Sequence, residues 1–306
     1  MPVQVGAPDM ANKNADTNSS SYSPNVPKLK SLAGYIAGLF EGDGHIWIPS
    51  TTHAPSGKFY SPRFMITFAL KDLPLAQYLS NLLGGVQIRM KESENACVLT
   101  INSIPLLILV VKLLNGLLRT PKIEQFNALI YWLKANGYAD LDTMPVDTSS
   151  LKENGWLSGF IDADGGFKIR VTQRILDASG KVARKGRVAC SFVLEQRMLT
   201  SSGLSYEQIM LLLCNSFKCK LNNSTHNGRI YYVMNLSSMV QLPLLVDYLD
   251  TYTLLSSKYL DYQSWRQAHI LMREGQHLTP DGLDKISKLK SEMNNSRTQF
   301  TWDHLP

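Results

Sequence analysis

Apolar and polar residues alternate along four short segments in the first half of the chain. Over residues 63–71, Phe64, Ile66, Phe68 and Leu70 face one way and mostly polar side chains face the other. The same period of two recurs at 44–50, 86–91 and 96–101. It is typical of antiparallel strands with one buried face. Apolar residues at helical spacing predict helices at 32–42, 73–83, 104–118 and 122–135.

The second half of the chain repeats this order. Alternation returns at 167–172 and 187–195, and two short strands flank Asn227-Gly228, a strong hairpin signal. Helices are predicted at 157–162, 205–217, 238–250, 256–273 and 280–292. The pattern therefore predicts an α+β fold made of two pseudo-symmetric αββαββα repeats, each with an antiparallel sheet.

This duplication divides the chain into four parts. Residues 1–27 are rich in Asn and Ser and offer little to bury, so a disordered leader is expected there. The first repeat is assigned to 28–138, a linker to 139–153 and the second repeat to 154–306. With 44% apolar and 18% charged residues, the chain can bury a core, and its net charge of +6 permits a nucleic-acid partner.

Cysteine usage and hydropathy exclude several classes of protein. The four cysteines have no Cys or His partner at zinc spacing, so we expect neither a disulfide framework nor a structural zinc, and a reducing compartment fits best. The most apolar stretch, 104–118, is shorter than a membrane span and contains Lys112. We expect no membrane association and no secretory signal.

The first helix of each repeat carries a related motif. It reads IAGLFEGDG over 36–44 and LSGFIDADG over 157–165. Gly38 and Gly159 correspond, and small residues near them share one helix face, which lets a second backbone approach closely. If the two helices pack through these faces, Asp43 and Asp164 converge at their ends. Two converging carboxylates repel, and a divalent cation would compensate.

Other interpretations of the motif are weaker. A membrane dimer face is excluded by the acids at Glu41 and Asp43. An EF-hand fails because Gly166 and Phe167 fill the next ligand and turn positions. A purely structural pair of helices with solvated acids remains open on these residues alone.

The two motifs together resemble the double signature of the LAGLIDADG homing endonucleases. In the first copy Glu41 stands for the first Asp of the motif and Gly42 for the Ala, while the second acid is Asp in both copies. The resemblance covers about residues 28–295. It implies two curved sheets that form a DNA-binding saddle, and a single chain that acts as a monomer without an obligate protein partner.

The resemblance also implies a site that hydrolyses phosphodiesters of double-stranded DNA with Mg²⁺. Mn²⁺ is expected to substitute, and Ca²⁺ to support binding without cleavage. The implied metal ligands are the carboxylates of Asp43 and Asp164 and the backbone carbonyls of Gly42 and Ala163. The further candidates for catalysis are two lysines that stabilise developing charge and one glutamine that orients water: Lys122, Lys258 and Gln196. The sequence leaves the counterpart of Gln196, near Lys71 or Asp72, unassigned.

Cationic side chains gather on the polar strand faces. Residues 167–187 contain seven Lys or Arg and one acid, Asp177, on a predicted hairpin. A two-stranded ribbon fits the major groove, where Arg and Lys can read guanine. The candidate DNA-binding residues are His45, Trp47, Lys58, Arg63, Arg89, Lys91, Lys168, Arg170, Thr172, Arg174, Arg184, Lys185, Arg187, Lys218, Lys220 and Arg229. A merely solvated sheet face would explain single charges well, but it explains less well why strand after strand in both repeats is polar on one side.

The first eleven residues, MPVQVGAPDMA, resemble a segment of cytochrome c oxidase subunit I. Such a segment is expected if the reading frame of a group I intron continues an upstream exon. The protein would then be made in the mitochondrial matrix, without a targeting segment. The DNA site would span the intron insertion point and would be asymmetric, because the two repeats differ in their strand residues.

Three rival functions stay open. The first is an RNA maturase that helps its own intron splice. The second is a DNA-binding protein that no longer cleaves, against which the intact Asp43 and Asp164 argue. The third is an unrelated hydrolase with two carboxylates, such as a glycosidase, which the cationic strands disfavour.

Overall fold

The computed structural model describes residues 23–306 apart from positions 54, 58, 174 and 185. Helix α1 begins at Val26, so residues 26 and 27 belong to a helix and not to the expected disordered leader. Asn25 caps this helix by accepting a hydrogen bond from the backbone N of Lys28, and Pro27 suits its first turn because a proline has no N–H to leave unpaired.

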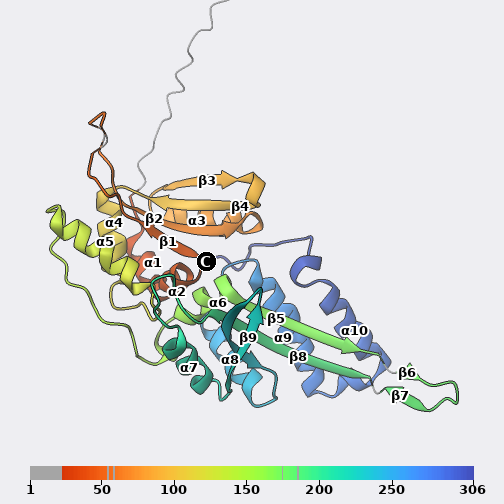
Figure 1. Cartoon of the computed structure of the whole chain (residues 1–306). Helices are drawn as coiled ribbons and strands as arrows, with labels where there is room; N and C mark the ends of the chain where they lie inside the picture. The colour runs from red at the N-terminus through yellow and green to blue at the C-terminus, as the bar shows by residue number, and fades with distance from the viewer. Residues whose placement is uncertain (1–22, 54, 58, 174, 185) are drawn as a thin grey trace, which may run out of the picture.

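The first repeat contains one antiparallel sheet in the order β1-β2-β4-β3, with helices packed on one side (Figure 1). Its elements are α1 (Val26–Ser31), α2 (Ala33–Asp43), β1 (Gly44–Trp47), β2 (Arg63–Ala69), α3 (Leu73–Leu82), β3 (Gln87–Lys91), β4 (Ala96–Ile101), α4 (Ile104–Leu114) and α5 (Ile123–Ala135). Helix α4 ends four residues before the predicted end, because Asn115 is extended and Gly116 has a φ of +88°.

The second repeat has the same architecture, with the sheet order β5-β8-β10-β9. Its elements are α6 (Trp156–Asp164), β5 (Gly165–Thr172), β6 (Ile175–Leu176), β7 (Val182–Arg184), β8 (Arg187–Arg197), α7 (Glu207–Ser216), β9 (Leu221–His226), β10 (Arg229–Leu236), α8 (Gln241–Thr251), α9 (Lys258–Arg273) and α10 (Pro280–Ser291). The short strands β6 and β7 form a hairpin at the tip of the β5–β8 connection (Figure 1). Five short 3₁₀ helices lie at Leu70–Asp72, Glu92–Glu94, Leu151–Glu153, Gln276–Leu278 and Asn294–Ser296.

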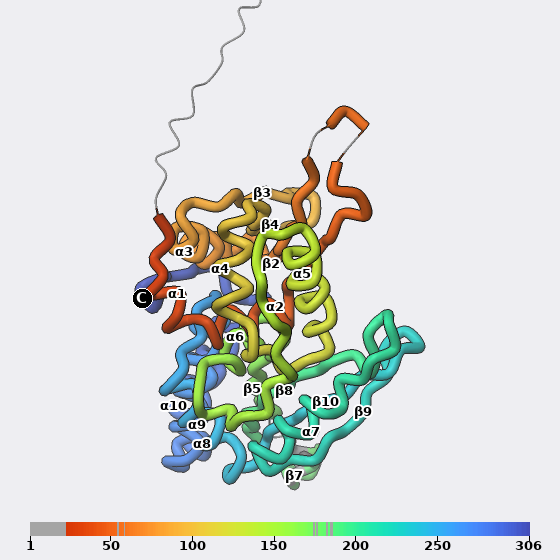
Figure 2. Tube along the Cα trace, turned by 90° about the vertical axis from the view of Figure 1, so that its left-hand side faces the viewer, coloured from red at the N-terminus to blue at the C-terminus, as the bar shows by residue number. Residues whose placement is uncertain are grey.

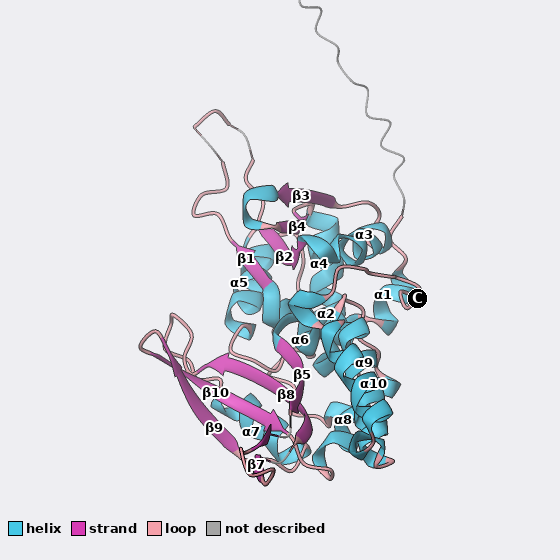
Figure 3. Ribbon diagram, turned by 90° about the vertical axis from the view of Figure 1, so that its right-hand side faces the viewer, coloured by secondary structure: helices cyan, strands magenta, loops and turns pink. Residues whose placement is uncertain are grey.

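The predicted α+β fold with two repeats is therefore confirmed. Figure 3 shows the β10–β9 edge of the second sheet reaching away from α9 and α10, which cover the opposite side of that repeat. On β2 and β8 every second residue is buried beneath helices, and the residues between them are exposed or half-buried. No helix in the described part of the chain is long and apolar enough to cross a membrane.

Helices α2 and α6 join the repeats at the centre of the molecule (Figure 2). A Cβ atom on Gly38 would lie 1.8 Å from the carbonyl oxygen of Trp156, and one on Gly159 would lie 1.9 Å from that of Tyr35. Since real Cβ atoms do not approach this closely, only glycine permits the contact. The small-residue faces are thus used to pack one repeat against the other, as the sequence predicts.

The connection between α5 and α6 is held against the first repeat by a buried ion pair. The guanidinium of Arg119 lies 2.6 Å from Oδ2 of Asp147 and donates to the carbonyl and hydroxyl oxygens of Ser149. The same guanidinium lies 5.7 Å from the ring of Trp156 at the start of α6. The linker is therefore anchored beside the helix interface.

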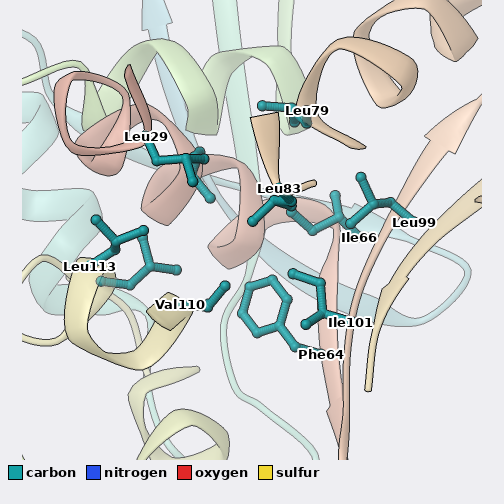
Figure 4. Close-up of a pocket in the computed structure, with 11 residues that line it drawn as sticks. Leu29, Phe64, Ile66, Leu79, Leu83, Leu99, Ile101, Val110 and Leu113 are labelled. Carbon is teal, nitrogen blue, oxygen red and sulfur yellow. The ribbon is translucent and has the colours of Figure 1, made fainter. Parts of the chain in front are cut away.

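A small cavity of about 20 Å³ lies in the core of the first repeat (Figure 4). Its lining is wholly apolar and includes Leu29, Phe64, Leu99 and Val110. An apolar cavity of this size offers water no hydrogen-bond partners. This cavity is a packing defect in the core and is separate from the site described next.

Candidate active site

The two motif acids stand at the junction between helix and strand in each repeat. Asp43 is the last residue of α2 and Asp164 the last of α6. The glycines that follow, Gly44 and Gly165, are extended and open the strands β1 and β5. Because the helices pack side by side, both carboxylates lie at adjacent helix C-termini, where the helix dipoles disfavour negative charge.

The electrostatics of the pair show this crowding. Both side chains remain accessible to solvent, yet the surrounding protein displaces enough water to raise their pKa values. For Asp43 this desolvation, followed by the charge of Asp164, raises the pKa to about 6. Desolvation also raises the pKa of Asp164, against the opposing effects of a hydrogen bond from Gln196 and of nearby cations. A bound cation would relieve the repulsion.

At the C-terminal end of each motif helix, a lysine side chain donates hydrogen bonds to backbone carbonyl oxygens. Nζ of Lys122 donates to the carbonyl oxygens of Gly42 at 2.6 Å and Gly44 at 2.9 Å. Nζ of Lys258 donates to those of Ala163 at 3.0 Å and Ile161 at 2.9 Å. Desolvation lowers the pKa of both lysines, and the motif carboxylates oppose that shift. Both predicted lysines thus lie beside the two acids.

The first acid of each motif has a different place. Glu41 accepts hydrogen bonds from the backbone N of Arg119 and Thr120, from the Thr120 hydroxyl, and from Nε1 of Trp156 in the other repeat. It is buried, and this desolvation raises its pKa to about 7 against the opposing hydrogen bonds. Glu41 therefore holds the loop that leads into Lys122.

Asp162 makes the equivalent set of contacts in the second repeat. It accepts from the backbone N of Leu255 and Ser256, from the Ser256 hydroxyl, and from the hydroxyl of Tyr35 in the first repeat. Sequence reasoning did not assign a role to either acid. The sequence signal for such a role was the position of each acid within a helix whose small residues predict close packing, where an acid needs hydrogen-bond partners.

The predicted glutamine contacts one acid only. Nε2 of Gln196 donates to Oδ2 of Asp164 at 2.6 Å. Strand pairing identifies its counterpart in the first repeat. Gly165 pairs with Leu194 on β8, and the equivalent Gly44 pairs with Ile66 on β2. Gln196 lies two residues after Leu194, so its counterpart is Phe68, two residues after Ile66. The counterpart that the sequence left unclear is therefore Phe68, not Lys71 or Asp72.

Asp72 instead binds the loop that leads into Lys258. Its Oδ1 accepts a hydrogen bond from the backbone N of Ser257 at 2.7 Å, just before Lys258. The charge of Asp72 raises the pKa of Asp43, as a smaller contribution than those of burial and Asp164. The two halves of the site therefore differ in charge.

A cleft of about 420 Å³ opens beside Asp164. Both repeats line it, through His45, Lys122, Gln125, Gln196 and Arg197 among others. Sequence reasoning missed Gln125 and Arg197, which carry no motif. This cleft has both charged groups and solvent access, unlike the apolar cavity of Figure 4.

The groups around the acids suit a hard cation. In the described part of the chain, no three His, Cys, Asp or Glu side chains cluster as a metal-binding group. Mg²⁺ keeps several waters and needs only one or two carboxylates. A Cβ on Gly42 would lie 3.3 Å from Oδ2 of Asp164, so the backbone of one motif borders the carboxylate of the other. The carbonyls of Gly42 and Ala163 accept from the lysines but retain a second lone pair each.

Most of the candidate DNA-binding residues lie on the exposed strand faces. His45, Trp47 and Arg63 share one face of the first sheet, with the Arg63 guanidinium 5.1 Å from the Trp47 ring centroid. Others lie on or beside the strands: Arg89, Lys168, Arg170, Thr172, Arg187, Lys220 and Arg229.

The remaining candidates are less centrally placed or are not described. Lys91 is paired with Glu94 at 3.1 Å. Lys218 lies in the turn after α7 and borders a groove beside α8. Lys58, Arg174 and Lys185 lie outside the described residues, as does the side chain of Arg184.

This combination of duplicated fold and paired motif acids defines a class of nuclease. The chain belongs to the LAGLIDADG endonuclease family, whose model matches residues 36–133 and 157–269. It is 29% identical over 304 residues to the intron-encoded DNA endonuclease aI3 of Saccharomyces cerevisiae, covering 90% of this chain and 72% of that protein.

Two further proteins extend the likeness. A cox1 intron-2 protein of Schizosaccharomyces pombe is 27% identical, over 83% of this chain and 70% of its own. The meganuclease I-SmaMI, in a crystal structure bound to uncleaveable DNA, has a TM-score of 0.68 at 19% identity and covers 87% of this chain and 98% of its own. The last likeness shows the shared fold.

Proposed function

We propose that this protein is a site-specific endonuclease that cuts double-stranded DNA and requires Mg²⁺. The observation that carries the proposal is the meeting of Asp43 and Asp164, one from each motif, at helix ends packed through Gly38 and Gly159. The membership of the endonuclease family supports it. A structural helix pair would not need two acids that both have pKa values raised by desolvation, with that of Asp43 raised further by the charge of Asp164.

The carboxylates of Asp43 and Asp164 and the carbonyls of Gly42 and Ala163 would hold the metal. A bound Mg²⁺ polarises a phosphoryl oxygen and lowers the pKa of a coordinated water. Mn²⁺ is expected to replace it, and Ca²⁺ to support DNA binding alone. Gln196 holds Asp164 in place by a direct hydrogen bond.

Lys122 and Lys258 would stabilise the negative charge that develops on the reacting phosphate. Both ammonium groups are held at the motif helix ends by carbonyl oxygens. Fixed cations of this kind need no reorganisation during the reaction. Glu41 and Asp162 position the two lysines through the loops that precede α5 and α9.

Each repeat would bind one half of a long DNA site. We assign residues 26–138 to one half-site and 154–306 to the other, with 139–153 as the linker. The strand residues differ between the repeats, so the site is asymmetric. Because the two motif helices are already packed against each other, the active protein is a monomer.

The target would span an intron insertion point in a mitochondrial gene. The relatives encoded by introns support this proposal. Residues 1–11, which lie outside the described residues, resemble an exon segment of cytochrome c oxidase subunit I. The protein would be made in the mitochondrial matrix, and the cut would lie near the codon for Ala11.

The test uses the purified chain and duplexes of the intronless oxidase gene across this junction. Cleavage in Mg²⁺ that is lost with EDTA, and lost when the intron interrupts the site, supports the proposal. A second arm uses a random duplex library, with sequencing of cut ends. Cleavage only at an unrelated sequence would reject the junction but keep the endonuclease. No cleavage of any duplex, with activity in a splicing assay of the intron RNA, would identify a maturase instead.

A further inference from the structure

An acidic side chain stands on the exposed face of the second sheet. Glu195 alternates along β8 with the buried residues Leu194 and Gln196, so it points away from the helices. Among the described strand residues of this face it is the only acid. The other Lys, Arg, Asp or Glu residues on the described strands of this face are all cations: Lys168, Arg170, Arg187, Arg197 and Arg229. A carboxylate here would repel DNA phosphates, so it needs another explanation.

The Glu195 carboxylate is neither buried in the core nor paired with a Lys or Arg of the described residues, so the fold does not explain it. Its side chain is 32% exposed and forms no ion pair with a described Lys or Arg. Glu195 instead extends across β10 to β9, where the Ser224 hydroxyl donates to Oε1 and Nε2 of His226 lies 2.9 Å from the same oxygen. Both contacts use Oε1, and no described residue donates to Oε2.

Because Oε1 of Glu195 is held by two contacts, the direction of Oε2 is also set, and Oε2 can accept a hydrogen bond from a donor on DNA. Glu195 also lines the cleft that contains Asp164, so it lies near the proposed cleavage centre. In the major groove the only base groups that donate are the exocyclic amines of cytosine and adenine. Adenine is read best by an amide, which pairs with both N6 and N7, whereas a carboxylate oxygen suits cytosine N4.

We propose that Glu195 reads the N4 amino group of a cytosine in the half-site bound by the second repeat, and that Ser224 and His226 are positioning residues that aim its free oxygen. This inference rests on the proposed function, because it requires DNA on this face. It adds a specificity-determining acid to a surface for which the sequence suggested no acidic residue.

The experiment compares wild type with Glu195→Gln on a set of duplexes in which each position of the wild-type site is changed singly. Wild type is expected to prefer cytosine at one position by at least about fivefold. Glu195→Gln is expected to lose that preference, or to shift it toward adenine, and to leave the other positions unchanged. Glu274→Gln, an exposed acid after α9, is the matched control and should keep the wild-type profile.

A second arm measures binding to the same duplexes in Ca²⁺, so that base preference is read without cleavage. If the chain binds with this preference but never cuts, the endonuclease proposal fails and the Glu195 proposal survives. If Glu195→Gln keeps the wild-type base profile in both arms, whether its overall affinity rises or falls, the Glu195 proposal is overturned. Ser224→Ala should weaken the cytosine preference at the same position only, and a change spread over all positions would also count against it.

Discussion

Gln196 donates a 2.6 Å hydrogen bond to Asp164, and the equivalent place beside Asp43 is occupied by the buried ring of Phe68. The two motif acids are thus related by pseudo-symmetry but have different surroundings. Asp72 adds a further negative charge on the Asp43 side. The two strands of a DNA target would meet unequal halves of one active site.

We expect Gln196→Leu to slow the cutting of one DNA strand by about tenfold or more and to change the other little, because only Asp164 loses its hydrogen bond. The measurement follows each end-labelled strand of a duplex, together with nicked plasmid. Phe68→Leu is the control and should leave both strand rates close to wild type. Equal slowing of both strands by Gln196→Leu would show that the halves act as one unit.

Asp43→Asn and Asp164→Asn are each expected to abolish double-strand cleavage and largely keep DNA binding in Ca²⁺. The carboxylates hold metal in our proposal, and neither reads bases. Cleavage is measured on the duplex target in Mg²⁺, and binding by fluorescence anisotropy. Either variant cutting both strands near the wild-type rate would remove that residue from the metal site.

The raised pKa of Asp43 predicts a dependence of stability on pH. Its pKa is about 6 in the folded protein, above the ordinary value of 3.8, because burial and Asp164 favour the protonated form. The folded state therefore binds this proton more tightly, and its contribution to the unfolding free energy falls as pH rises from about 4 through about 6.

The comparison is between wild type and Asp43→Asn in metal-free buffer, by chemical denaturation at several pH values. As pH rises from about 4 through about 6, the unfolding free energy of wild type should fall relative to that of Asp43→Asn, and the difference should stay constant above this range. Parallel pH curves for the two proteins would contradict the assignment of the raised pKa to Asp43.

Gly38→Ala is expected to destabilise the protein by about 1–3 kcal/mol or more, because its new Cβ would fall 1.8 Å from a backbone oxygen of Trp156. Gly166→Ala is the matched control, since the nearest atom to its Cβ, the carbonyl oxygen of Val193, lies at 3.8 Å. Urea unfolding measures both. Equal stability of the two variants would mean that α2 and α6 separate without penalty.

DNA binding is expected to weaken steeply with salt, because phosphate contacts release counterions. Lys168→Ala should reduce the slope of log affinity against log salt by about 1 if it contacts a phosphate. Lys285→Ala, an exposed lysine on α10, is the control and should not change the slope. An unchanged slope for Lys168→Ala would place that residue outside the phosphate contacts.

The residue of the first repeat that corresponds to Gln196 could not be predicted from the sequence. The motif acids are 121 residues apart, whereas Phe68 and Gln196 are 128 apart and Lys122 and Lys258 are 136 apart. The offset grows because the segment that contains the first two paired strands is longer in the second repeat, as is the segment between it and the lysine. Alternation within a strand cannot reveal how many residues its loop contains, so the counterpart of Gln196 could not be found without the strand pairing.

Sequence patterns alone predict the order of helices and strands, the duplication and the pair of motif acids. These features depend on local periodicity and on glycines whose small size is visible in the residue type. Tertiary packing is needed to place Glu41 against Trp156, Asp162 against Tyr35, and Glu195 beside Ser224 and His226. These partners are far apart along the chain. Their contacts follow from how two helices cross and three strands align, which no local pattern encodes.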